Sequence, residues 1–251
     1  MASAVKAKGL SRGAMLSVGL GAREVKARFL DSFTSGHAVV ACINSLRSVT
    51  VSGDATAVEE VAENIAAANN GIFHRKLLVD TAYHSHHMRA VANEYRDRIS
   101  KAAEGMVLED EAGEVAFVSS ITGEPKKSNF NADYWVSNLI SPVNFADALQ
   151  TLGKKHRRAG AKSLFVEIGP HPSLSGPTRQ SNIFQRQQGD MPQVSIEYLA
   201  PLQRKIDAIN SALALAGKLF EYSVPITWDT VSTLTPGIDT ASVRHNLPAY
   251  K

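Results

Sequence analysis

The sequence predicts an α/β fold whose first part is a ferredoxin-like βαββαβ unit, over about residues 10 to 80. Short runs of apolar and β-branched residues predict strands, and apolar residues at helical spacing predict the helices between them. The order strand-helix-strand-strand-helix-strand is the ferredoxin-like pattern. With 251 residues, of which 44% are hydrophobic and 20% charged, the chain can bury a substantial core.

The first four elements of this unit follow one another closely. Ala14 to Leu20 is an apolar run that predicts a strand, and Ala22 to Leu30 predicts a helix. Two more strands are expected at Ala38 to Ile43 and at Ser48 to Ser52, where β-branched residues gather.

The second helix of the unit is expected to start at Asp54, a residue type that suits an N-cap. Asn69-Asn70-Gly71 is expected to end it, because these residues tolerate a positive φ. Phe73 to Val79 then forms the fourth strand. The apolar face of the helix is predicted to comprise Val58, Val61, Ala62, Ile65 and Ala66.

The rest of the chain predicts further helices and strands that are less self-contained. Met88 to Ile99 has an amphipathic helical pattern, and Val115 to Ser119 reads as a strand. Asp133 is expected to cap a short helix through Leu139. Pro142 fits the first turn of the next helix, which runs to about residue 152.

Two more strands are expected at Leu164 to Ile168 and at Val194 to Leu199. Between them, Gly169 to Pro172 predicts a tight turn that leads into a helix. Ile206 to Phe220 is a long amphipathic pattern, and after residue 225 no periodicity remains. These strands predict part of an α/β sheet, from which further strands are expected to be missing.

Composition excludes several classes of function. A net charge of +3 with a pI near 8.9, and basic residues that are scattered, argue against nucleic-acid binding. The single cysteine, Cys42, excludes a disulfide framework and a cysteine zinc site, and fits a reducing compartment. No run approaches the roughly 18 to 20 apolar residues of a membrane span. We expect a cytoplasmic protein with no membrane partner.

The strongest chemical signal is the run Asp80 to Met88, which holds His84, His86 and His87 between a strand and a helix. Clustered histidines suggest a metal site, but zinc ligands normally converge from separated positions together with a carboxylate or cysteine. Asp80 is the only such residue nearby, so no metal site is predicted. Histidines that only cap or pack remain an alternative.

The run from Asp80 to Met88 resembles the histidine motif of acyltransferase domains in fungal highly reducing polyketide synthases. The resemblance continues in Asn44 to Asp54, in Tyr134 to Val143 and in Val166 to Pro172, and Leu247 to Tyr250 resembles the end of the linker that follows these domains. It implies a malonyl-CoA:acyl carrier protein transacylase fold, here a partial α/β-hydrolase-like core with an inserted ferredoxin-like subdomain. Residues 81–203 would then be the C-terminal part of that core, and 204–251 a linker helix and tail.

The resemblance also implies residue roles. In the family a serine attacks the malonyl thioester, and a histidine, here His84, is the general base. The backbone carbonyl of Asn138 would orient the imidazole of His84, and Tyr83 would select malonyl over branched acyl groups. His86 and His87 are expected to be structural, and His171 to line the cleft or brace its turn.

The implied substrate is malonyl-CoA, and the implied acceptor is the phosphopantetheine thiol of an acyl carrier protein, with no bound cofactor. The expected partners are this carrier protein and the remaining domains of a synthase that makes a reduced fungal polyketide, a secondary metabolite such as a toxin.

The chain is expected to lack the serine and the malonyl-binding arginine of the family. Neither Ser52-Gly53 nor Ser173 to Gly176 forms a Gly-x-Ser-x-Gly elbow after a strand, and Arg12 and Arg23 do not align with the arginine. Three interpretations follow: a truncated domain that is inactive alone, half of a split acyltransferase with a serine-bearing partner, or a noncatalytic module that binds carrier protein.

Overall fold

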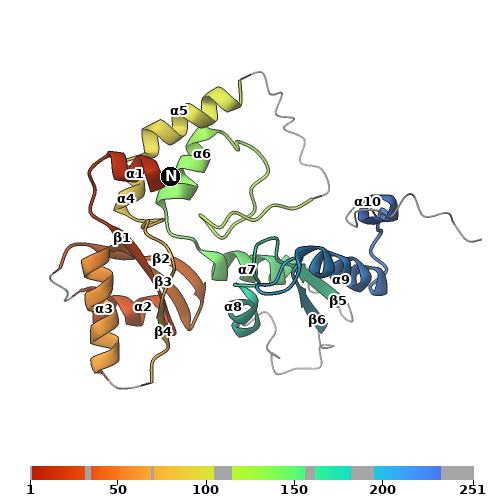
Figure 1. Cartoon of the computed structure of the whole chain (residues 1–251), viewed down its shortest axis with the longest axis horizontal. Helices are drawn as coiled ribbons and strands as arrows, with labels where there is room; N and C mark the ends of the chain where they lie inside the picture. The colour runs from red at the N-terminus through yellow and green to blue at the C-terminus, as the bar shows by residue number, and fades with distance from the viewer. Residues whose placement is uncertain are drawn as a thin grey trace, which may run out of the picture. The chain divides into compact units, whose positions relative to one another are not determined.

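A computed structural model shows the chain as two compact units (Figure 1). One comprises residues 1–159 and 176–193, and the other residues 160–175 and 194–251. The domain boundaries predicted near residues 80 and 203 stay a prediction. The structure describes residues 2–31, 35–68, 71–104, 115–155, 162–181 and 195–232.

The first unit contains a four-stranded antiparallel sheet in the order β2-β3-β1-β4. With one helical segment after β1 and another after β3, this order is that of a ferredoxin-like subdomain, and the prediction is confirmed. The fourth strand is shorter than predicted. The strands are β1 (Gly13–Val18), β2 (Ala38–Ser45), β3 (Ser48–Asp54) and β4 (His74–Lys76).

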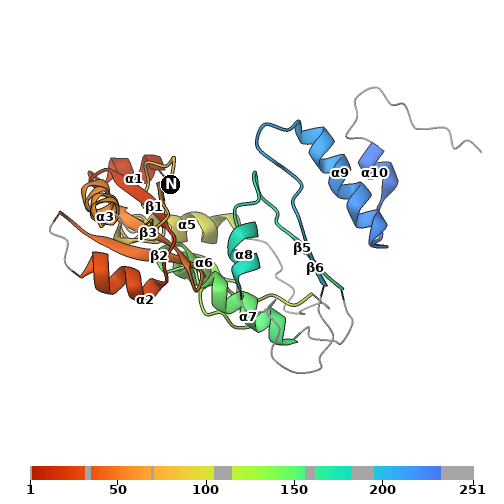
Figure 2. The same cartoon turned by 90° about the horizontal axis from the view of Figure 1, so that it is seen from below.

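Two helical segments cover one face of this sheet. The first, α2 (Ala22–Val25), continues as a π-helical turn, η1 (Lys26–Leu30), and α3 (Ala55–Ala67) lies against β1 and β3 (Figure 2). Burial of the large side chains in this core contributes about 1.5–3 kcal/mol each. Of the predicted face of α3, Val58, Val61 and Ile65 are buried, Ala62 is partly buried, and Ala66 is exposed. The core includes Leu16, Val18, Val25, Phe29, Val49, Val51, Val58, Val61 and Ile65.

A segment from much later in the chain extends the edge of β2. The Val143 N–H donates to the carbonyl of Ala41 at 2.8 Å, and the Ile43 N–H donates to the carbonyl of Val143 at 2.8 Å. The next helix, α7 (Phe145–Lys155), therefore begins after this pairing, and the prediction that Pro142 lies in its first turn is wrong.

A second, smaller core joins helices from both ends of the first unit. Val5 of α1 (Ala2–Ala7) packs with Met88 and Val91, and residues of α6 (Ala132–Ile140) pack against this cluster. The single helix predicted from Met88 is interrupted, and becomes α4 (His86–Arg89) and α5 (Ala92–Ala102).

Two local predictions in this region are wrong. The cap of α6 is Asn131, whose side chain accepts from the Tyr134 N–H at 3.0 Å, whereas Asp133 lies in the first turn and pairs with Arg96 at 2.7 Å. The strand predicted from residue 115 is reduced to one bridge between Val118 and Pro125.

The second unit is built on a parallel pair of strands. β5 (Lys162–Val166) pairs with β6 (Ser195–Leu199) close to the positions where the sequence predicts two strands, and the parallel pairing itself is a finding of the structure. The last helices are α9 (Ala208–Glu221), which starts two residues after Ile206, and α10 (Trp228–Ser232), where no periodicity was expected. Between β5 and β6 the chain forms α8 (Ser175–Gln180), which apart from Ser175 belongs to the first unit.

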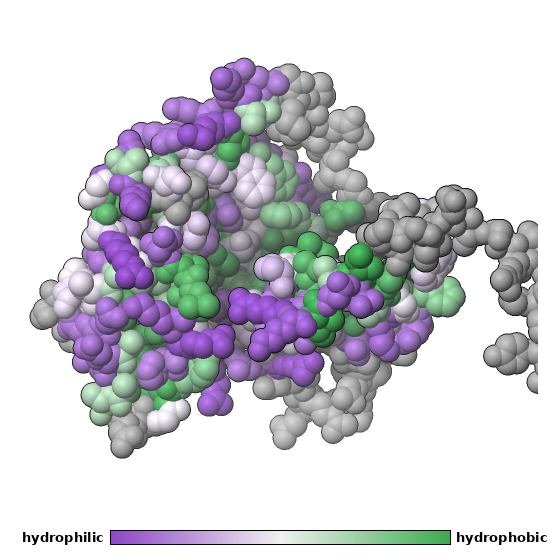
Figure 3. Space-filling model, viewed as in Figure 1, coloured by the Kyte–Doolittle hydropathy of each residue, from purple (hydrophilic) through white to green (hydrophobic). Residues whose placement is uncertain are grey.

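Hydrophilic side chains occupy much of the surface in view, with hydrophobic residues between them (Figure 3). Several large apolar side chains are nevertheless exposed, Leu78 at 99%, Val115 at 87% and Ile168 at 83%. Within the described part of the chain, no helix is both long enough and apolar enough to cross a bilayer.

Candidate active site

The imidazole of His84 is held by the backbone of a distant loop. Its Nδ1 lies 3.1 Å from the carbonyl oxygen of Ser141. A carbonyl oxygen only accepts hydrogen bonds, so Nδ1 carries the proton and the neutral ring has its lone pair on Nε2. This is the tautomer that a general base needs.

Burial also favours the neutral ring. Desolvation lowers the pKa of His84 below its ordinary value, and this effect outweighs the hydrogen bonds to the backbone of Ser141 and Asn138, which raise it. The ring is therefore unprotonated at neutral pH and able to accept a proton. The orienting role predicted for the Asn138 carbonyl stays a prediction.

Three local features fix the loop that carries His84. His84 has a φ of 59°, a conformation that costs energy for a residue other than glycine and is often found at functional sites. Ser85 caps α4, because its hydroxyl accepts from the His87 N–H and donates to the Ala82 carbonyl. Gly13 of β1 lies so close that a Cβ would stand 2.5 Å from the Ala82 nitrogen.

The other predicted site residues lie in different surroundings. Tyr83 is half-buried and packs against the cluster of Val5, Met88 and Val91, and its role in selectivity stays a prediction. His171 belongs to the second unit, and its place in a cleft likewise stays a prediction. Its carbonyl accepts from the Ser173 N–H at 2.7 Å, within the predicted turn.

The turn that holds His171 is anchored by a residue that sequence reasoning did not single out. The Glu167 carboxylate accepts from the backbone N–H groups of Ser173 and Leu174, at 3.0 and 3.1 Å, and from the hydroxyl of Tyr198 on β6. Glu167 directly follows β5, so it ties the turn to the parallel strand pair.

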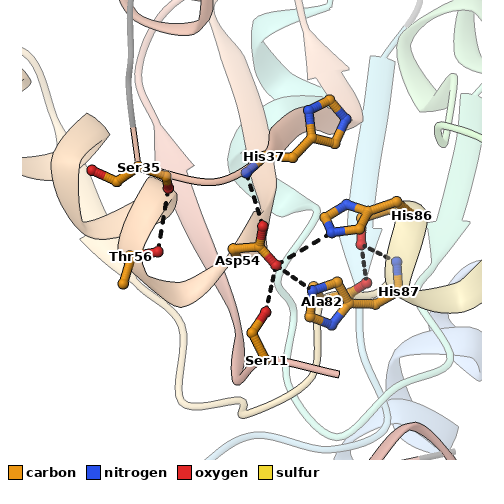
Figure 4. A network of polar contacts seen from close by, with 9 residues as sticks. Ser11, Ser35, His37, Asp54, Thr56, Ala82, His86 and His87 are labelled. Carbon is orange, nitrogen blue, oxygen red and sulfur yellow. Dashed lines mark hydrogen bonds and ion pairs between the residues drawn. The ribbon is translucent and has the colours of Figure 1, made fainter. Parts of the chain in front are cut away.

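Asp54 is the centre of the polar network beside the histidine run (Figure 4). Its Oδ1 accepts from Ser11 Oγ at 2.6 Å and lies 2.8 Å from His87 Nε2 and 3.3 Å from His86 Nε2, while Oδ2 accepts from the His37 N–H at 2.8 Å. Asp54 occupies the N-cap position of α3 but makes no capping hydrogen bond with its side chain. The predicted N-cap position is therefore confirmed, but the side chain does not cap the helix because these other donors occupy the carboxylate.

Burial opposes ionisation of Asp54, but the hydrogen bonds from Ser11, His87 and the His37 backbone outweigh it, and the nearby His86 adds to them. The pKa of Asp54 is consequently held well below its usual range. The carboxylate that meets the histidines is Asp54 and not Asp80, the residue that the sequence suggested.

The family is decided by comparison with known proteins. The family described as "Acyl transferase domain" matches residues 3–220. The chain belongs to this family. The resemblance inferred from the histidine motif is thereby confirmed.

The chain is similar to fungal highly reducing polyketide synthases. It is 48% identical to highly reducing polyketide synthase 17 of Metarhizium anisopliae over 260 aligned residues, which cover 100% of this chain and 8% of that protein. It is 44% identical to the highly reducing polyketide synthase ltbA of Aspergillus luteorubrus, covering 99% of this chain and 8% of that protein. The acyltransferase chain thus spans less than a tenth of the length of these relatives.

Solved structures support the acyltransferase fold. The acyltransferase domain from module 8 of the salinomycin polyketide synthase has a TM-score of 0.69 and 28% identity, covering 91% of this chain and 49% of that one. The malonyl CoA-acyl carrier protein transacylase of Clostridium perfringens has a TM-score of 0.64 at 21% identity, a likeness of fold alone, with coverage of 88% and 62%.

The expected absence of the acyltransferase serine pattern needs a correction. The spacing Gly-x-Ser-x-Gly does occur once, as Gly9-Leu10-Ser11-Arg12-Gly13, so the prediction that the chain lacks the pattern is wrong. The surroundings differ from a nucleophile elbow, which is a strand-to-helix turn. Ser11 instead follows α1 and precedes β1, and its hydroxyl donates to Asp54.

Proposed function

We propose that this chain provides the general base, His84, of an acyltransferase that moves malonyl from malonyl-CoA to an acyl carrier protein. The observation that carries the proposal is the contact between His84 Nδ1 and the Ser141 carbonyl, because it leaves the Nε2 lone pair free. Membership of the acyl transferase family and the lowered pKa of His84 support it.

The proposed reaction has two half-steps. His84 Nε2 accepts the proton of a serine hydroxyl while the serine oxygen attacks the malonyl thioester carbonyl, and the CoA thiolate leaves with that proton. In the second half, the phosphopantetheine thiol of the carrier protein gives its proton to His84 and attacks the malonyl-serine ester. The serine oxygen leaves with the proton from His84, and the malonyl thioester forms on the carrier protein.

We infer that the nucleophilic serine does not come from Ser11. Ser11 Oγ donates to Asp54, and a carboxylate whose pKa is so strongly lowered is a poor base for a serine hydroxyl. The nucleophile and the malonyl-binding arginine would then be supplied by another segment, on the same or on a separate polypeptide. Without them the chain is inactive by itself.

We also propose which acyl group is preferred and which partners take part. Tyr83 is adjacent to the base, and its bulk would crowd an α-methyl branch, so that malonyl is preferred. The carrier protein and the remaining domains of a polyketide synthase are the proposed partners.

The test is a chimeric acyltransferase domain in which this chain replaces the matching segment of the Metarhizium anisopliae synthase. With malonyl-CoA and the phosphopantetheinylated carrier protein of that synthase, we expect malonyl transfer. His84→Gln should reduce its rate by about 10²–10⁴-fold, the usual contribution of a general base.

The matched control is His74→Gln, which changes a histidine of β4 in the same unit whose ring Nδ1 forms a hydrogen bond with the carbonyl of Ile72. This variant should keep the rate of the unchanged chimera. If His84→Gln transfers malonyl as fast as His74→Gln, His84 is not the base and the proposal fails.

A further inference from the structure

Asp54, His86 and His87 form a cluster with the geometry of a metal site. Their ligand atoms, one carboxylate oxygen and two imidazole nitrogens, all lie within 4.8 Å of one another. We propose that these three residues bind a divalent transition-metal ion of the zinc type. The proposal does not depend on the role of His84.

The distances between the donor atoms suit a shared ion. Asp54 Oδ1 is 2.8 Å from His87 Nε2 and 3.3 Å from His86 Nε2. Ligands that each lie about 2.0–2.2 Å from a zinc ion are separated from one another by roughly 3 Å. Small outward movements of the three groups would therefore admit the ion.

The donor set also matches the chemistry of such ions. Two neutral imidazoles and one carboxylate are ligands that zinc accepts, with a water at the fourth position. The carboxylate is ready as a ligand, because the backbone N–H of His37 and the hydroxyl of Ser11 hold Asp54 in place. Hydrogen bonds of this kind, from neighbouring groups to a ligand side chain, orient metal ligands.

Two of the three side chains in this cluster are largely buried, which distinguishes it from a chance grouping of surface side chains. The side chain of His87 is 0% exposed, and that of Asp54 is 18% exposed. The Nδ1 atoms of His86 and His87 are buried and have no hydrogen-bond partner among the described residues. An ion bound at Nε2 would place the proton of each neutral ring on Nδ1, and this change of tautomer breaks no hydrogen bond on that side.

The simpler alternative is a hydrogen-bonded network without metal. In that arrangement a single oxygen, Asp54 Oδ1, serves Ser11, His86 and His87 together. With a bound cation the two imidazoles would no longer compete as donors to that oxygen, because each would coordinate the ion through its Nε2 atom. It would also connect the end of β3 to α4, close to the loop that carries His84.

The experiment is calorimetric titration of the full chain, without a histidine tag and stripped of metal by a chelator, with zinc chloride. We expect one zinc ion per chain. X-ray absorption of the loaded chain should show only nitrogen and oxygen neighbours, at about 2.0–2.2 Å. No binding by the folded chain would overturn the proposal.

Variants assign the ligands. His86→Gln and Asp54→Asn should each weaken zinc binding by at least about tenfold, since loss even of a supporting contact has that effect. His74→Gln, on β4, should bind as the unchanged chain does. His86 is partly exposed, with 32% of its side chain accessible, so His86→Gln is the variant expected to fold normally, which circular dichroism verifies. Equal zinc affinity in folded His86→Gln and His74→Gln would contradict the proposed site.

Discussion

The His84 imidazole and the Ser141 carbonyl meet at 3.1 Å although they are 57 positions apart in the sequence. The contact depends on the chain just after Ser141, where Val143 pairs with the edge strand β2. The orientation of the proposed base therefore depends on the ferredoxin-like sheet, through two backbone hydrogen bonds.

This dependence predicts the effect of Val143→Pro. Proline has no N–H, so the bond from Val143 to the Ala41 carbonyl is lost, at a net cost of about 0.5–1.5 kcal/mol. Displacement of the Ser141 carbonyl should lower malonyl transfer by the chimeric domain by at least about tenfold. Val143→Ala keeps the N–H and should keep most of the activity. Similar rates for the two variants would show that this pairing does not position His84.

Asp54 should be important for stability whether or not metal is bound. In Asp54→Asn the charge that attracts four donor groups is lost, and we expect a loss of about 1–3 kcal/mol in the free energy of unfolding. Urea denaturation in the presence of a chelator measures it. The control, Asp97→Asn, changes an exposed carboxylate on α5 and should stay within about 0.5 kcal/mol. If the free energies of unfolding of the two variants differ by less than about 0.5 kcal/mol, Asp54 does not have this stabilising role.

Ser11 should not behave as an activated nucleophile. Its hydroxyl donates to a weakly basic carboxylate, so a fluorophosphonate reagent that modifies catalytic serines should leave it unmodified. Mass spectrometry of the chimeric domain after treatment should find the label on a serine of the Metarhizium anisopliae portion. Label on Ser11 would place the nucleophile within this chain and would overturn that part of the proposed function.

The thiol of Cys42 should react slowly in the folded chain. Burial raises its pKa to about 11, and the hydrogen bond with Thr50 offsets this only in part. The folded state thus favours the protonated thiol. The stability that this contributes is present below the ordinary thiol pKa of about 8.5 and is lost as pH rises toward 11.

Iodoacetamide at pH 8.5 should therefore alkylate native Cys42 much more slowly than the same residue in the urea-unfolded chain, because the thiolate is the reactive form. Equal rates in the two states would show that the pKa is not raised.

The parts of the fold that sequence reasoning predicted are those with a local signal. The ferredoxin-like strands and α3 follow from the periodicity of their own residues, and the histidine run identifies the family. The strand expected at Val115 has a local pattern, but the structure forms only one bridge there.

The predictions that failed concern contacts between residues that are far apart in the sequence. Asp54 looks like an N-cap to a local pattern, and only the fold brings Ser11 and the two histidines, from before and after it, to its carboxylate. Likewise Pro142 suits the start of a helix, but the pairing of the next residue with β2 delays α7 to residue 145. The Ser141 carbonyl carries no side-chain signal at all.

The most direct test of the account is the single-turnover rate of serine malonylation in the chimeric domain, measured by rapid quench with and without His84→Gln. We expect the substitution to slow malonylation by about 10²–10⁴-fold while the variant stays folded. An unchanged rate would contradict the central claim that His84 is the base.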